Sequence, residues 1–158
     1  MIKNDILFMK EALKEAREAF EKDEVPVGAV VVHKGKIIAR AHNQVELLGD
    51  PTAHAEMIAL TQATNYLRSK WLNDSTLYVT IEPCSMCAGA LVLARIKSIY
   101  FGANDPKTGA CGSVVNIIDN KKLNHRISVK RGILEEECSL LLTEFFKNKR
   151  RLEAARNN

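Results

Sequence analysis

The chain is 158 residues long, with 46% hydrophobic residues, 27% charged residues and a formal net charge of +4. This balance lies in the range of folded globular proteins and excludes an intrinsically disordered or fibrous chain. No apolar stretch is long enough to cross a membrane, and the N-terminus lacks the features of a secretory signal. We therefore expect a single domain over residues 1–158, located in the cytoplasm, in which Cys84, Cys87, Cys111 and Cys138 are reduced.

Apolar periodicity and β-branched runs divide the chain into helices and strands. In chain order they predict a helix over residues 5–22, a hairpin of strands over 28–33 and 37–42, a helix over 53–67, a strand over 77–81, a helix over 84–94, a strand over 98–102, a short helix over 112–118, a strand over 127–130 and a helix over 134–151. Strands that alternate with helices after an initial hairpin favour an α/β domain. The expected architecture is a three-layer α/β/α fold with a central mixed five-stranded sheet.

Two short motifs carry candidate metal ligands. The first contains His54, and the second is a Cys-x-x-Cys pair formed by Cys84 and Cys87. Alone, the cysteine pair is also typical of a redox dithiol or of half of a structural zinc site. The sequence offers no second close pair of cysteines or histidines, which favours three protein ligands and a fourth position for water, as in catalytic zinc sites. Because His54 and Cys84 each begin a predicted helix, we expect them at the same edge of the sheet.

Glu56, two residues after His54, is the candidate general base. A carboxylate beside a zinc-bound water can take its proton and deliver it to a substrate. Residues two apart do not share a face inside a helix, so His54 and Glu56 can face one site only within the first turn. The alternative is that Glu56 merely stabilises the positive end of the helix.

A His-x-Glu motif followed by Pro-Cys-x-x-Cys is the mark of zinc nucleobase deaminases. More narrowly, the sequence resembles the bacterial tRNA-specific adenosine deaminase family, within the cytidine/deoxycytidylate deaminase superfamily. The resemblance implies a cytidine-deaminase-like fold, one Zn²⁺ per subunit, a homodimer, and conversion of the wobble adenosine of a tRNA anticodon stem-loop to inosine. It is carried by residues 25–30, 42–43, 51–56, 77–80, 82–90, 101–103, 105–107, 124–126, 132–134 and 145–146.

The same resemblance assigns residues that bind the substrate. It implies that Asn43 hydrogen-bonds the flipped base and that Pro26 and Val27 form apolar walls around it. An asparagine amide offers a purine edge both a donor and an acceptor. Asp105 and Lys107 would lie along the RNA. From the residues alone, Asn43 is also consistent with a local turn cap, and the segment around Asp105 with an ordinary proline-containing turn.

The C-terminal segment extends the candidate RNA surface. His125, Phe145, Phe146, Arg150 and Arg151 would supply stacking platforms for unpaired bases and cations for phosphates. Adjacent aromatic residues on a helix point about 100° apart, so we expect one phenylalanine to be buried and the other to face RNA. The alternative for the basic residues is a solvated helix end, where cations are also favoured.

The expected reaction is hydrolytic deamination, in which Glu56 moves the protons. Two other functions remain open. One is deamination of a free base or nucleoside, such as guanine or cytidine, on the same scaffold. The other is a zinc module that binds nucleic acid without catalysis, although that interpretation leaves Glu56 without a role. Cys111 and Cys138 are expected to be small buried hydrophobic residues.

Overall fold

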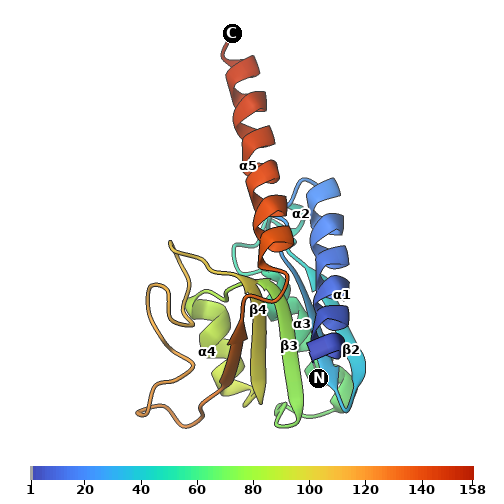
Figure 1. Cartoon of the computed structure of the whole chain (residues 1–158), viewed down its shortest axis with the longest axis vertical. Coiled ribbons are helices and arrows are strands. Elements are labelled where there is room, and N and C mark those ends of the chain that lie inside the picture. The colour runs from blue at the N-terminus through green and yellow to red at the C-terminus, as the bar shows by residue number, and fades with distance from the viewer. Residues whose placement is uncertain (1) are drawn as a thin grey trace.

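The computed structural model describes residues 2–158 (Figure 1). No helix in this range is both long and apolar enough to cross a membrane. The elements are α1 (Ile2–Glu21), β1 (Gly28–His33), β2 (Lys36–His42), α2 (Val45–Leu48), α3 (Ala55–Leu67), β3 (Ser75–Ile81), α4 (Ser85–Leu93), β4 (Ser98–Ala103), β5 (Ser128–Arg131) and α5 (Glu135–Arg156).

The strands form one five-stranded sheet in the order β2-β1-β3-β4-β5. β1 is antiparallel to β2 and β3, whereas β3, β4 and β5 are parallel to one another. The predicted mixed sheet is therefore confirmed. Because β3 and β4 are parallel, the segments that follow them leave the sheet at the same edge.

Helices cover both faces of the sheet, which confirms the predicted three layers (Figure 1). Side chains alternate along β1, so Ala29 and Val31 belong to the core beneath α3 and α4, whereas Val30 and Val32 belong to the core beneath α1. Gly28 permits the close approach of α1, because a Cβ there would overlap the Ala12 carbonyl oxygen. α5 extends well beyond the sheet (Figure 1).

The helix predicted over 112–118 is wrong, because this segment consists of turns with an isolated bridge between Cys111 and Asn116. Gly112 has φ +130°, which is incompatible with a helix. The N–H groups of Cys111 and Ser113 donate to the Glu82 carboxylate instead of to helical carbonyls. The four-residue helix α2 was not expected, and α5 continues five residues beyond the predicted end at 151.

Candidate active site

The helix starts place the candidate metal ligands as predicted. His54 is the N-terminal cap of α3 and Cys84 is the cap of α4, and both have extended backbones. Glu56 lies in the first turn of α3. The condition that allows His54 and Glu56 to face one site is therefore met.

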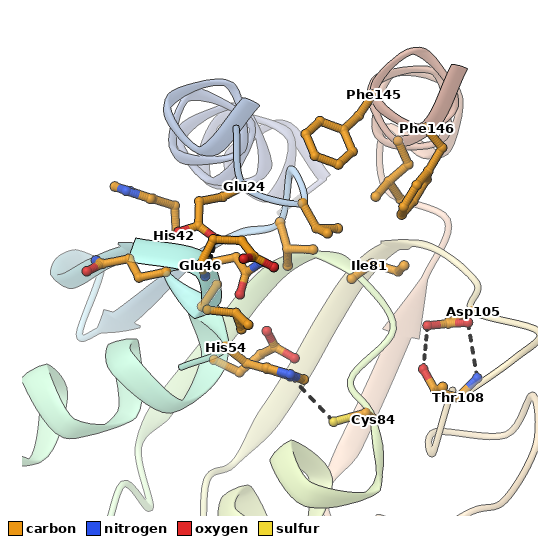
Figure 2. A pocket seen from close by; sticks show the side chains of 18 of the residues that line it. Glu24, His42, Glu46, His54, Ile81, Cys84, Asp105, Thr108, Phe145 and Phe146 are labelled. Carbon is orange, nitrogen blue, oxygen red and sulfur yellow. Dashed lines mark hydrogen bonds between the residues drawn. The ribbon is translucent and has the colours of Figure 1, made fainter. Parts of the chain in front are cut away.

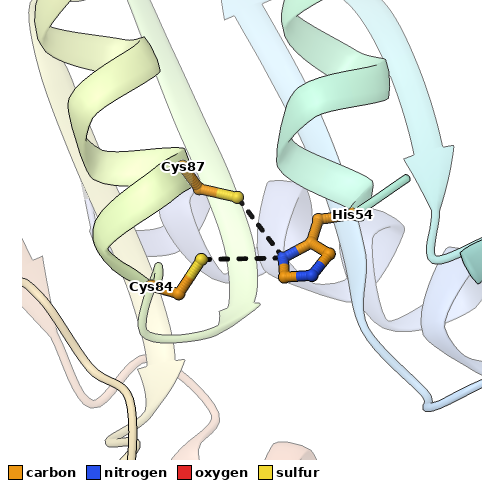
Figure 3. Close-up of side chains that lie close together, drawn as sticks. All are labelled: His54, Cys84 and Cys87. Carbon is orange, nitrogen blue, oxygen red and sulfur yellow. Dashed lines mark hydrogen bonds between the residues drawn. The ribbon is translucent and has the colours of Figure 1, made fainter. Parts of the chain in front are cut away.

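His54, Cys84 and Cys87 meet at the edge of the sheet (Figure 3). The His54 Nδ1 atom lies 3.6 Å from Cys84 Sγ and 3.5 Å from Cys87 Sγ. In a tetrahedral zinc site with Zn–S of about 2.3 Å and Zn–N of about 2.0–2.1 Å, the nitrogen and sulfur atoms are about 3.6 Å apart. The three side chains thus fit a zinc ion, and residues 2–158 contain no other such cluster of three His, Cys, Asp or Glu side chains.

The electrostatics of this group favour an ionised sulfur. Hydrogen bonds with the Cys87 thiol, which has the larger effect, and with His54 lower the pKa of Cys84 to about 4. The Cys84 contact in turn raises the pKa of His54. A thiolate at the start of a helix is the form that binds a metal ion.

Glu56 is 3% exposed, and burial raises the pKa of its carboxyl group above the ordinary value. A raised pKa makes the carboxylate a stronger proton acceptor than an exposed glutamate. Its position beside His54 therefore suits proton transfer at the metal site.

The metal group opens into a cavity of about 1220 Å³. This volume exceeds the usual range of about 300–1,000 Å³ for small-ligand pockets. Figure 2 shows His54 and Cys84 at one end of the cavity, the two phenylalanines of α5 at the other, and Asp105 to one side. The predicted site residues that line it are Val27, Asn43, His54, Glu56, Cys84, Asp105, Lys107, Phe145 and Phe146.

Asn43 lines this cavity and carries a buried hydrogen-bond acceptor that has no partner. Its side chain is 6% exposed, and its Oδ1 atom has no partner among the described residues. Its backbone N–H donates to the carbonyl of Val27 (3.1 Å), which fixes the residue beside the pocket wall. A buried, unpaired acceptor is costly unless a ligand supplies the donor.

The segment at Asp105 forms a turn and also lines the cavity. Asp105 Oδ1 accepts from the N–H groups of Lys107 (3.0 Å) and Thr108 (3.1 Å), and its Oδ2 accepts from the Thr108 hydroxyl (2.7 Å). The carboxylate is thus used within a turn, as the structural interpretation predicts. The same turn nevertheless lines the cavity and presents the exposed Lys107 there.

Four of the predicted substrate-binding residues do not line this cavity. Pro26 is buried but does not line the cavity, whereas Val25 does. His125 lies beyond the opposite end of β4, where its Nε2–H donates to the Ile96 carbonyl (2.7 Å). Arg150 and Arg151 are exposed but do not line the cavity.

Helical periodicity explains which part of α5 reaches the cavity. Its lining residues follow a spacing of three and four and are Leu142, Phe145, Phe146, Lys149 and Glu153. Phe145 is 6% exposed and Phe146 is 44% exposed, so the prediction of one buried and one exposed ring is confirmed. Lys149 forms an ion pair with Asp23 (2.7 Å), and both residues line the cavity.

Two buried glutamates at the site were missed. The Glu24 carboxylate accepts hydrogen bonds from the N–H groups of Glu46 and Leu47 (both 2.8 Å) and so caps the N-terminus of α2. The Glu82 carboxylate accepts hydrogen bonds from residues 105–113. Burial raises the pKa of this carboxyl group, but the hydrogen bonds from Ser113 and the other donors lower it by more, so the net shift is downward. The available signal for Glu82 was a charged residue at the end of an otherwise apolar strand.

Cys111 and Cys138 are buried, as expected for small apolar residues. All four cysteines are free.

Comparison with known proteins points to one family. A family model described as MafB19-like deaminase matches residues 3–150. The tRNA-specific adenosine deaminase of Bacillus subtilis (strain 168) is 50% identical over 155 residues, which cover 98% of this chain and 96% of that protein. A structure from a study of A-to-I editing by tRNA:A34 deaminases at the wobble position is 46% identical, with a TM-score of 0.83 over 86% of this chain and 99% of that chain. A guanine deaminase from Nitrosomonas europaea is 25% identical, with a TM-score of 0.77 over 89% of this chain and 83% of that chain.

Proposed function

The chain belongs to the tRNA-specific adenosine deaminases, and on that premise we propose that it hydrolyses the wobble adenosine of a tRNA anticodon to inosine and ammonia. The observation that carries this proposal is the position of the buried Glu56 beside His54, Cys84 and Cys87, at the end of a cavity that Asn43 also lines.

We assign one zinc ion per subunit to His54, Cys84 and Cys87, because their spacing fits tetrahedral zinc and three protein ligands leave one position open. When bound there, zinc supplies a hydroxide nucleophile near neutral pH. The remaining chemistry falls to side chains of the chain itself.

Glu56 acts as the proton carrier. Its carboxylate takes a proton from the attacking water and delivers it to N1 of the adenine ring as the new bond forms at C6. The carboxylate then takes the proton of the new hydroxyl group at C6 and gives it to the amino group, so that the C6 carbonyl of inosine forms as ammonia leaves. Burial of Glu56 excludes bulk water from this exchange.

Asn43 and Val27 orient the flipped base. Asn43 lines the cavity and its buried Oδ1 acceptor has no partner, so we assign this atom to an N–H of the base. Val27 supplies an apolar wall beside it. Phe146 and Lys107, both exposed along the cavity, are placed for an unstacked base and a phosphate.

We further propose a homodimer that packs through the outer face of α3 and α4. Leu93 is 81% exposed on this face, and it borders a groove that also contains Leu60 and Ala90. Gly89, inside α4, has open space where a Cβ would be, and a glycine within a helix costs about 1 kcal/mol relative to alanine. Close approach of a second copy would account for this glycine.

The dimer is tested by light scattering of the Leu93→Glu variant. A charge at the centre of the interface should produce a monomer, whereas the control Leu152→Glu, at a 58% exposed position of α5, should stay dimeric. A wild-type monomer would contradict the assignment. We also propose a cytoplasmic location, which the four free cysteines favour.

The activity is tested by incubating the zinc-loaded protein with an anticodon stem-loop, with guanine and with cytidine. We expect inosine from the stem-loop and no conversion of the free compounds. Conversion of guanine alone would instead favour the activity of the Nitrosomonas europaea relative.

A further inference from the structure

Glu82 is a buried carboxylate whose partners all come from one segment. It follows β3 directly, two residues before Cys84, and is 1% exposed. Its Oε1 atom accepts from the Asp105 N–H (3.2 Å) and the Ser113 hydroxyl (2.5 Å). Its Oε2 atom accepts from the N–H groups of Cys111 (3.0 Å) and Ser113 (3.1 Å). Residues 105–113 are therefore folded around this side chain.

The backbone that follows Glu82 strengthens the same attachment. The Ala110 N–H donates to the Pro83 carbonyl (2.8 Å), and Gly109 pairs with Cys84 in an isolated bridge. A Cβ at Gly109 would overlap the Glu82 carboxylate, so the segment passes too close for any side chain there. Residues 82–84 thus join the segment to the metal group.

The attached segment forms one wall of the cavity. Asp105, Lys107 and Thr108 line it. The Asp105 N–H is held by Glu82, and the Asp105 carboxylate in turn holds the N–H groups of Lys107 and Thr108. The position of this wall therefore depends on a chain of contacts that begins at Glu82.

We propose that Glu82 is a positioning residue for the RNA substrate, because it holds the cavity wall from Asp105 to Thr108 at a fixed place relative to Cys84. A carboxylate has about four acceptor positions, and Glu82 uses all of them within the chain. No acceptor position is left for a substrate donor, so Glu82 acts through Asp105. This inference rests on the proposed function, and its effect should appear in substrate binding more than in the chemical step.

The test is Glu82→Gln with Ser113→Ala as its control. The glutamine can keep its side-chain oxygen toward the N–H groups of Cys111 and Ser113. Its NH₂ group then faces the Asp105 N–H, and two donors cannot form a hydrogen bond with each other. We expect KM for the anticodon stem-loop to rise about tenfold, with kcat within about threefold of the wild type and equal zinc content. Ser113→Ala leaves the Asp105 contact intact, so both constants should stay within about threefold.

Amide hydrogen exchange measured by NMR on the RNA-free protein supplies a readout that does not depend on activity. In Glu82→Gln the Asp105 amide should exchange about ten times faster, whereas the Cys111 amide should change less than about threefold. An unchanged KM in Glu82→Gln overturns the inference, and so does unchanged Asp105 exchange. A loss of kcat at constant KM also overturns it. If the wild type leaves the stem-loop unmodified, the proposed function fails, while the exchange measurement still decides whether Glu82 holds the segment.

Discussion

Phe145 and Phe146 are neighbours in α5 that should respond in opposite ways to alanine. Phe145 is 6% exposed and packs edge to face against Phe20, with ring centroids 5.8 Å apart. Removal of a buried phenylalanine costs about 3–5 kcal/mol of unfolding free energy, and we expect about 3 kcal/mol because Phe145 also borders the open cavity. In a chain of this size that loss lowers Tm by about 6–12 °C.

Phe146, in contrast, is 44% exposed along the same cavity. Stacking of a base on an aromatic side chain contributes about 1–3 kcal/mol, so Phe146→Ala should weaken stem-loop binding about 5- to 150-fold. Its Tm should fall by less than that of Phe145→Ala, because Phe146 is far more exposed than Phe145. Both effects are measured on the same samples, by thermal unfolding and by equilibrium binding.

Leu152→Ala is the control for a substitution on α5 outside the cavity, since Leu152 is 58% exposed. Its Tm and its affinity for the stem-loop should both match the wild type. The reasoning would be refuted if Phe146→Ala lowered Tm as much as Phe145→Ala does, or if it left stem-loop affinity unchanged.

Three further substitutions test the site itself. Glu56→Gln should retain zinc by elemental analysis but lower kcat about 10²- to 10⁴-fold. The control Glu153→Gln, at another residue that lines the cavity, should leave kcat unchanged. Substantial turnover by Glu56→Gln would contradict the role assigned to Glu56. Cys84→Ser should lose both bound zinc and activity, and a chelator should inactivate the wild type until zinc is restored; a metal-free active protein would contradict the ligand set. Asn43→Ala should lower kcat/KM about 10- to 100-fold without lowering Tm, because its Oδ1 atom is unpaired in the free protein; a large loss of stability would indicate a structural role.

The metal group was predictable from sequence because its geometry is local. Cys84 and Cys87 are separated by one turn of α4, and His54 caps α3, so helix starts alone bring the three side chains to one edge. The mixed sheet was predictable for a similar reason, since a hairpin followed by alternating strands and helices favours few architectures.

The parts that were missed depend on contacts between distant residues. The apolar run at 112–118 resembles a helix, but Glu82, some thirty residues earlier in the chain, takes the N–H groups of Cys111 and Ser113. No local pattern shows that a carboxylate will do this. In contrast, the sequence could have shown that Lys149 and not Arg150 lines the cavity. Lys149 follows Phe145 by four residues and Phe146 by three, so it lies on the same face of α5.

The catalytic groups and the cavity walls come from different parts of the fold, and this separation affects how the site selects its substrate. The metal ligands and Glu56 lie at two helix starts, whereas the cavity walls come from the segments 22–27 and 42–47, from the segment after β4 and from α5. The guanine deaminase relative shares the fold at 25% identity, which is consistent with one scaffold that serves different bases. Because residues 105–113 are attached to the metal group through Glu82, changes in that segment can alter which substrate fits while the chemistry at Glu56 is preserved. We therefore expect the preference for RNA to depend on the segment and on α5, and the hydrolytic reaction to depend on His54, Glu56 and the two cysteines.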